Sequence, residues 1–121
     1  MSTRSFIAVK KEDKSYDAIY CHFDGYPEGV GAMLLENYNT KELIEKLISN
    51  GDMSSIGKTT KECVFYHRDR EEELNISRYK TKAELDKAYR ASWCQYLYIF
   101  NEDVWYCNGE KLEEVLKEIE Y

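Results

Sequence analysis

The apolar residues of this chain fall into short runs and alternating stretches that predict several β-strands. Residues 6–9 form a short apolar run typical of a buried strand. Residues 16–23 alternate, so we expect Ile19, Cys21 and Phe23 to share one face of a strand. These two segments predict a hairpin. Further strands are expected at residues 62–67, 96–100 and 104–107. The last two predict a second hairpin.

Other apolar residues recur at helical spacing and predict about four helices. Asn39 is the expected N-cap of the second helix, with Glu42 completing a capping-box-like arrangement and Gly51 ending the helix. Thr81 and Glu84 form a capping box proper before the third. The expected buried stripes are Val30, Met33, Leu34 and Tyr38; Leu43, Ile44, Leu47 and Ile48; Leu85, Ala88, Tyr89, Ser92 and Trp93; and Leu112, Val115, Leu116 and Ile119.

The order of these elements, ββααβαββα, indicates an α+β fold. Hairpins with helices gathered beside them favour a mostly antiparallel sheet of about five strands, with about four helices. The polar segments 52–61 and 68–80 are expected to be loops. The length of 121 residues suits one domain, so residues 1–121 are predicted to form a single α+β domain.

The charge of the chain narrows the functional classes. A formal net charge of −6 argues against a general nucleic-acid binder, which needs cationic surface to displace counterions. It suits an acidic surface that docks on a basic partner. Eleven tyrosines add apolar area with a polar tip, which suits both cores and binding faces. The sequence shows no signal peptide and no apolar run near the length of a membrane helix, so we expect a cytoplasmic protein that does not bind membranes.

The four cysteines, Cys21, Cys63, Cys94 and Cys107, form no CxxC pair and are expected to be free, mostly buried thiols. Cys21, His22, Cys63 and His67 match no zinc-binding spacing, so we predict no metal and no other cofactor. Cys21 and His22 are neighbours on a strand and point to opposite faces, which argues against a cysteine nucleophile.

The strongest local feature is the turn that follows the second strand, residues 20–31. His22 and Asp24 lie two apart on the predicted strand and so share a face, where His22 could act as a base beside a carboxylate. The simpler interpretation is a turn in which Asp24 or Glu28 caps the next helix. The glycines here lack the lysine and the length of a phosphate-binding loop.

Two charged segments could contact a partner. Arg68 and Arg70 open a stretch of mixed charge that is either a solvated loop or an anion-binding or partner-binding site. The chain after Glu102 is rich in acids, which form either a solvated helix face or a docking surface. The predicted partner-binding residues are Glu71, Glu72, Glu73, Glu113, Glu114 and Glu118.

Several segments of the first half resemble a family of small, uncharacterised phage and prophage proteins. The family carries a Thr-Arg-Ser strand and a Tyr-Cys-His-aromatic-Asp-Gly-Tyr turn, matched here by Thr3-Arg4-Ser5 and by Tyr20-Cys21-His22-Phe23-Asp24-Gly25-Tyr26. The resemblance also covers residues 34–38 and 50–57 and continues weakly over 65–71. Small acidic accessory proteins of phages are often counter-defence inhibitors, including anti-CRISPR proteins, so the resemblance implies that class of function.

The leading hypothesis is a non-enzymatic, stoichiometric inhibitor that binds a bacterial defence protein, for example a CRISPR effector, through an acidic, tyrosine-rich surface. It would act in the bacterial host cytoplasm without contacting nucleic acid directly, and a homo-oligomer is left open. A rival is a small-molecule or nucleotide-signal binder built from Arg4, His22, Asp24, Tyr26, Glu28, Arg68 and Arg70. A third is a small hydrolase that uses His22 and Asp24.

Overall fold

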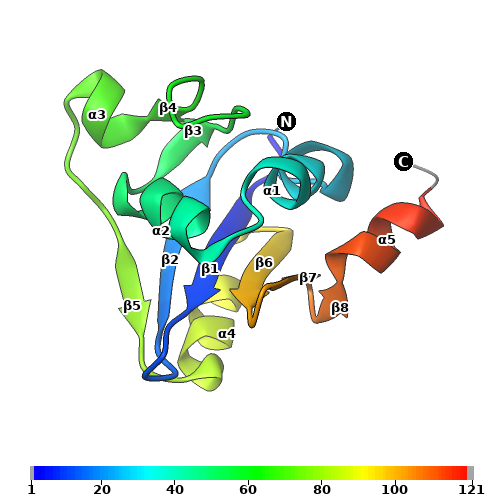
Figure 1. Ribbon diagram of the computed structural model, residues 1–121. Helices are drawn as coiled ribbons and strands as arrows, with labels where there is room; N and C mark the ends of the chain where they lie inside the picture. Colours follow the sequence, from blue (N-terminus) through cyan, green and yellow to red (C-terminus); the bar gives the residue numbers. More distant parts are fainter. Residues whose placement is uncertain (1, 120–121) are drawn as a thin grey trace.

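A mixed eight-stranded sheet forms the centre of the protein in a computed structural model that describes residues 2–119 (Figure 1). The strands run in the order β4-β3-β2-β1-β6-β7-β8, and β5 pairs with the outer edge of β2. The strands are β1 (Ser5–Lys10), β2 (Tyr16–Cys21), β3 (Met53–Ser55), β4 (Val64–Phe65), β5 (Ser77–Tyr79), β6 (Tyr96–Asn101), β7 (Val104–Cys107) and β8 (Glu110–Lys111).

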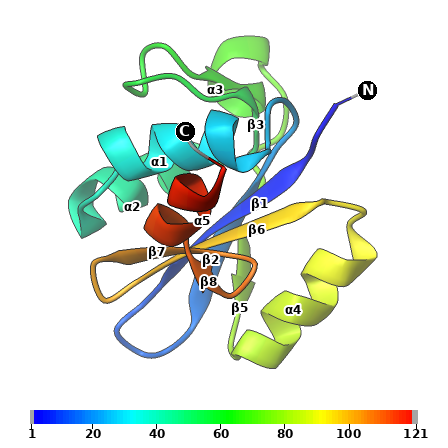
Figure 2. The same cartoon turned by 90° about the vertical axis from the view of Figure 1, so that its right-hand side faces the viewer.

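Helices cover both faces of this sheet unequally, as Figures 1 and 2 show. A π-helical turn and three helices lie over the larger core, whereas α4 alone covers part of the opposite face. The helical elements are η1 (Pro27–Gly31), α1 (Ala32–Asn37), α2 (Lys41–Ser49), α3 (Tyr66–Arg70), α4 (Lys82–Ala91) and α5 (Leu112–Glu118). Among residues 2–119, every helix is too short or too polar to cross a lipid bilayer.

The fold is α+β, but the sheet is not mostly antiparallel and has more strands than expected. β1 runs parallel to β6, with Ile7 opposite Tyr98, and β2 runs parallel to β3 at Cys21 and Met53. Parallel neighbours need a long crossover, so their pairing joins residues far apart in the sequence. The local pattern predicts the two hairpins correctly, and it contains no signal for the pairing between them.

Several element boundaries also differ from the prediction. The second helix begins after Thr40, whose hydroxyl accepts a hydrogen bond from the Leu43 amide, so Asn39 is not its N-cap. The predicted loops contain β3, α3 and β5, and the strand expected at 62–67 is shortened to β4 because α3 starts at Tyr66. Trp93 was expected on the buried face of α4. It is 85% exposed, because the helix ends at Ala91 and the backbone of Trp93 is left-handed.

The short hairpin between β7 and β8 was missed although the sequence carries a signal for it. Asn108 and Gly109 have φ values of 49° and 89°, the left-handed backbone that a two-residue hairpin turn requires. Asparagine and glycine tolerate this conformation best, and the dipeptide is a strong indicator of such turns. The turn sends the chain back into β8 and then directly into α5.

Two buried aromatic residues join the sheet to the helical layer through their polar atoms. The Tyr98 hydroxyl donates a 2.6 Å hydrogen bond to the carbonyl of Gly25, in the turn before η1. The Trp105 indole donates a 2.9 Å hydrogen bond to the carbonyl of Tyr38, just after α1. Both rings are buried in the larger core, so each hydrogen bond satisfies a donor that would otherwise be costly there.

Asp52 closes a gap on the outer edge of β2. β5 pairs with Tyr16–Ala18 of this edge and β3 with Cys21, which leaves the amide of Tyr20 without a strand partner. An Asp52 carboxylate oxygen accepts that amide's hydrogen bond at 2.8 Å, while its backbone accepts from Tyr66 and donates to Asn75. Burial raises the pKa of the Asp52 carboxyl, and the hydrogen bond from Tyr20 offsets part of that rise.

Asp52 therefore yields a prediction about stability and its pH dependence. Asp52→Asn keeps an acceptor for Tyr20 and removes a half-buried charge, so it should match or exceed the parent's unfolding free energy at neutral pH. Asp52→Ala removes the acceptor and should cost about 1–3 kcal/mol. Urea denaturation at several pH values measures both changes.

The raised pKa fixes the direction of the pH effect. The folded protein takes up a proton at Asp52 before the unfolded chain does, so the parent gains stability relative to Asp52→Asn as the pH falls toward the unfolded pKa. If Asp52→Asn is as destabilised as Asp52→Ala at neutral pH, then the negative charge of Asp52, and not its hydrogen-bond acceptor, stabilises the outer edge of β2.

Candidate functional site

The turn after β2 holds His22 between two hydroxyl groups. His22 Nδ1 is hydrogen-bonded to the Tyr20 hydroxyl at 2.6 Å, and Nε2 to the Ser2 hydroxyl at 3.0 Å. The Phe23 ring packs edge-on against the imidazole, with ring centroids 4.6 Å apart. Both ring nitrogens are thus engaged with hydroxyls, and among residues 2–119 no carboxylate orients the imidazole as a triad would require.

Asp24 does not join His22. β2 ends at Cys21 and Asp24 has a left-handed backbone with φ of 57°, so the strand alternation that would place the two side chains together stops short. An Asp24 carboxylate oxygen instead accepts a hydrogen bond from the Tyr26 hydroxyl at 3.2 Å. Within residues 2–119, His22 and Asp24 make neither a hydrogen bond nor an ion pair with each other. The pair on which the hydrolase hypothesis depends is not assembled.

The expected side-chain cap is also absent from this turn. Tyr26 holds the N-cap position of η1 without a side-chain cap, and Pro27 begins the turn. The Val30 amide donates to the backbone carbonyl of Asp24 at 2.8 Å, so the backbone of Asp24, and not its carboxylate or that of Glu28, satisfies the start of η1. The carboxylates of Asp24 and Glu28 are exposed.

Arg68 is occupied by structural contacts. Its guanidinium donates to the carbonyls of Thr60 and Cys63 at 2.7 and 2.9 Å and to the carboxylate of Asp69 at 2.9 Å. It also lies over the Phe65 ring, 4.9 Å from the centroid. These contacts fasten the segment before β4, and they leave few donors for an anion.

The other residues of the predicted ligand site lie in different parts of the structure and make separate contacts. Arg70 lies over the ring of Tyr66, 5.2 Å from its centroid. Arg4 is exposed, and its backbone amide donates to the Gln95 side chain at 2.9 Å. The structure brings Asp24, Tyr26 and Glu28 together around η1, but records no contact that joins them to the arginines in the described residues.

Three of the four cysteines are buried, as expected. Burial raises the pKa of Cys21 to about 12 and of Cys107 to about 11, which keeps both thiols protonated at neutral pH. The sulfur of Cys63 accepts a hydrogen bond from the Gly57 amide at 3.3 Å. The described part of the chain contains no cluster of three or more His, Cys, Asp or Glu residues arranged to hold a metal ion.

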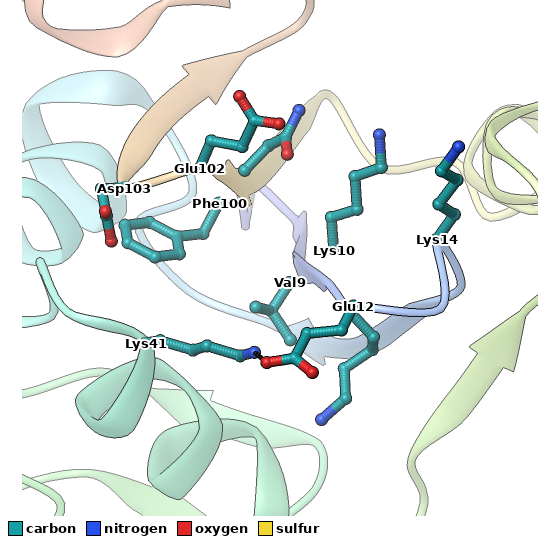
Figure 3. Close-up of a pocket in the computed structure, with 10 residues that line it drawn as sticks. Val9, Lys10, Glu12, Lys14, Lys41, Phe100, Glu102 and Asp103 are labelled. Atoms are coloured by element: carbon teal, nitrogen blue, oxygen red, sulfur yellow. Dashed lines mark hydrogen bonds and ion pairs between the residues drawn. The ribbon is translucent and has the colours of Figure 1, made fainter.

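A hollow of about 340 Å³ opens where β1 and β6 end, beside the two hairpin turns (Figure 3). Val9 and Phe100 line it with apolar surface. Lys41 pairs with Glu12 at 3.1 Å in one wall, and Glu102 and Asp103 come from the β6–β7 turn opposite.

The lysines of this hollow do not create a cationic site. Lys11 is paired with Glu45 and, at 3.8 Å, with Asp17. Lys10 and Lys14 extend to the same side in Figure 3, and the nearby Glu102 and Asp103 oppose their charge. Cations and carboxylates are nearly balanced around this hollow, so it favours neither an anion nor a cation.

The helical layer carries the clearest concentration of like charge. α5 packs against η1 and α1, and the contact is close, because a Cβ on Gly31 would lie 3.0 Å from a methyl group of Leu112 (Figure 2). A hollow of about 160 Å³ beside η1 and α1 is lined by three carboxylates. We define the acidic face as these carboxylates and those exposed on α5: Asp24, Glu28, Glu36, Glu113, Glu114 and Glu118.

Most of the acids on α5 lie at the end of the helix that favours negative charge. The helix begins at Leu112, so Glu113 and Glu114 occupy its first turn, where the helix dipole favours negative charge. Only Glu118 lies at the unfavourable end. In residues 27–37 and 112–118, all of which the structure describes, Lys117 is the one basic residue, and it lies 3.8 Å from Glu113.

The predicted partner-binding residues separate into two groups. Glu71, Glu72 and Glu73 follow α3 at the β4 edge of the sheet, whereas α5 follows β8 at the opposite edge (Figure 1). All six side chains are exposed. Of the tyrosines, Tyr38 and Tyr98 are buried in the core, whereas Tyr26 is exposed next to Asp24.

Comparison with known proteins adds no relative. A scan against protein-family models, a search of curated proteins and a search of solved structures each returned no match.

The burial of the thiols predicts their reactivity. In the native protein at about pH 8, a disulfide reagent such as DTNB should modify at most Cys94, which is half-buried and whose pKa is also raised by burial. All four thiols should react in denaturant. Cys94→Ser should abolish the native reaction. Rapid modification of Cys21 or Cys107 in the folded protein would contradict the burial that raises their pKa values.

Proposed function

We propose that this protein is a non-enzymatic binding protein whose acidic face docks on a basic surface of a bacterial defence protein, for example the nucleic-acid channel of a CRISPR effector. The observation that carries the proposal is the acidic face itself. It takes carboxylates from the turn before η1, from η1 and α1, and from α5, which packs against η1 and α1; across residues 27–37 and 112–118, all described, Lys117 is the only cation. The resemblance of the first half to phage proteins suggests the class of partner.

Electrostatics supports docking through this face. A surface of one sign raises the local concentration of an oppositely charged partner and steers its approach, with on-rates that rise by about 10- to 1000-fold. Proteins that bind nucleic acid present lysine and arginine to phosphates, and carboxylates on a rigid helical layer can occupy the same cationic surface. The net charge of −6 adds to this attraction at long range.

The rigidity of the face also supports the proposal. α5 is anchored by Leu112 and Leu116, which are 0% and 5% exposed, and η1 is fixed by the hydrogen bond from Tyr98 to Gly25. A preorganised face loses little conformational entropy on binding. The groups that would supply catalysis are instead engaged in structure: His22 between two hydroxyls, and Arg68 in carbonyl and carboxylate contacts.

Stoichiometry distinguishes this proposal from catalysis. When the protein is titrated into purified nucleic-acid-guided nucleases of bacterial defence systems, a susceptible nuclease should be half-inhibited near a one-to-one ratio, as binding without turnover requires. A gel-based cleavage assay at fixed nuclease concentration measures this. Complete inhibition at about a thousandth of the nuclease concentration would indicate turnover and overturn the binding proposal.

The two acidic groups provide a matched pair of variants for a susceptible nuclease. Glu113→Gln/Glu114→Gln/Glu118→Gln should slow association about tenfold at low salt and reduce its salt dependence, because three steering charges are lost. The control, Glu71→Gln/Glu72→Gln/Glu73→Gln, removes equal charge at the other edge and should have a much smaller effect. Stopped-flow or surface-plasmon-resonance kinetics at several salt concentrations measures both.

Folding should survive in both triple variants, because exposed substitutions usually change stability by less than about 0.5 kcal/mol each. Equal slowing in the two variants would mean that net charge alone drives association. Loss of binding only in the Glu71–Glu73 variant would move the docking surface to the segment after α3.

A further inference from the structure

The face of the sheet opposite the acidic face carries a groove along one side of α4. Two adjoining hollows of about 210 and 370 Å³ share Lys82, Ile99 and Gly109 in their linings, so they form one continuous groove between α4 and the strands β6 and β7. Of the α4 residues, only Leu85 is fully buried.

The turn between β7 and β8 keeps this groove open. The Asn108 side-chain oxygen accepts hydrogen bonds from the Leu97 amide at 2.7 Å and from the Tyr89 hydroxyl at 3.4 Å, which ties α4 to the strand edge at a fixed separation. Gly109 adds no side chain, and a Cβ built there would meet no atom within 4 Å. The rim at Gly109 therefore carries no side chain.

The lining of the groove combines apolar and aromatic surface. Leu97 and Ile99 are 5% and 8% exposed and form the apolar surface of β6. Tyr16, Tyr89 and Tyr106 line it from three different elements. Aromatic walls over an aliphatic floor are typical of sites that take a flat ring.

Two polar groups in the groove have no partner among residues 2–119. Tyr16 is only 6% exposed, yet its hydroxyl makes no hydrogen bond to any residue from 2 to 119. Arg90 lines the larger hollow, and its guanidinium makes neither a hydrogen bond nor an ion pair within the same range. Lys82, by contrast, is neutralised by Asp86 at 2.7 Å. Among the described residues, the groove therefore presents one guanidinium and one hydroxyl that are not engaged by another side chain.

We propose that this groove binds a small planar aromatic anion, with its ring against Tyr89 and Tyr106 and its charged group on Arg90. A guanidinium binds carboxylate or phosphate through paired hydrogen bonds, and Tyr16 can donate to or accept from a polar edge of the ring. A nucleoside monophosphate and an aromatic carboxylate share this chemistry. The site is independent of the acidic face, because the sheet separates α4 from η1, α1 and α5.

The test is an NMR titration of the 15N-labelled full chain with adenosine 5′-monophosphate and, separately, indole-3-acetate. At least one should shift the amides of Leu97, Ile99, Asn108 and Gly109 with a Kd at or below about 1 mM. Adenosine and inorganic phosphate, which each lack half of the recognised chemistry, should bind at least tenfold more weakly. Binding of the first probe alone identifies a nucleotide site, and binding of the second alone identifies a carboxylate site.

Matched variants test whether Arg90 binds the charged group of the probe. Arg90→Gln should weaken the bound probe about tenfold, whereas Lys87→Gln, an exposed cation on the same helix outside the groove, should leave its Kd unchanged. Tyr106→Leu should weaken it as well, because it removes an aromatic wall. Urea denaturation confirms that each variant folds. The proposal is overturned if neither probe binds at about 10 mM, if the shifts fall outside the groove, or if Arg90→Gln and Lys87→Gln behave alike.

Discussion

The parallel pairing of β1 with β6 joins the two halves of this protein. Each strand belongs to its own hairpin, β1 with β2 and β6 with β7, and only this pairing makes the hairpins one sheet. It buries Ile7 and Tyr98 in the core under η1 and Ala8 and Ile99 in the core under α4. Both helical coverings therefore depend on it, and so do the acidic face and the groove that they create.

The turn between β2 and η1 is held against the sheet by core residues, and it carries acidic side chains at the surface. Gly25 is packed so closely that a Cβ would lie 2.7 Å from the carbonyl oxygen of Thr3, and its own carbonyl receives the Tyr98 hydroxyl. Asp24 and Glu28 flank this fixed point. Their exposed carboxylates are thereby held on a rigid base beside α5.

The two faces of the sheet differ in chemistry because they are covered differently. The face under η1, α1, α2 and α5 is largely covered by helices, and the outer surface of η1, α1 and α5 is acidic. The face under α4 carries a groove in which apolar and aromatic side chains of the sheet lie beside Arg90. The first arrangement favours electrostatic docking of a large partner. The second favours enclosure of a small one.

The sequence by itself determined the features that depend on neighbours within a few residues. The capping box of Thr81 and Glu84, the buried positions Leu112 and Leu116, the two hairpins and the α+β class follow from local hydrogen bonds and periodicity. Only the tertiary structure decided the mixed sheet, because strand pairing between distant segments leaves no local pattern. The same holds for Asp52, which sequence placed in a loop and which completes the edge of β2. It holds equally for both candidate sites: the acidic face joins residues 24–36 to α5, and the groove joins Tyr16 to Arg90 and Tyr106. Sequence reasoning could identify the acids, but which side chains meet is set by long-range packing.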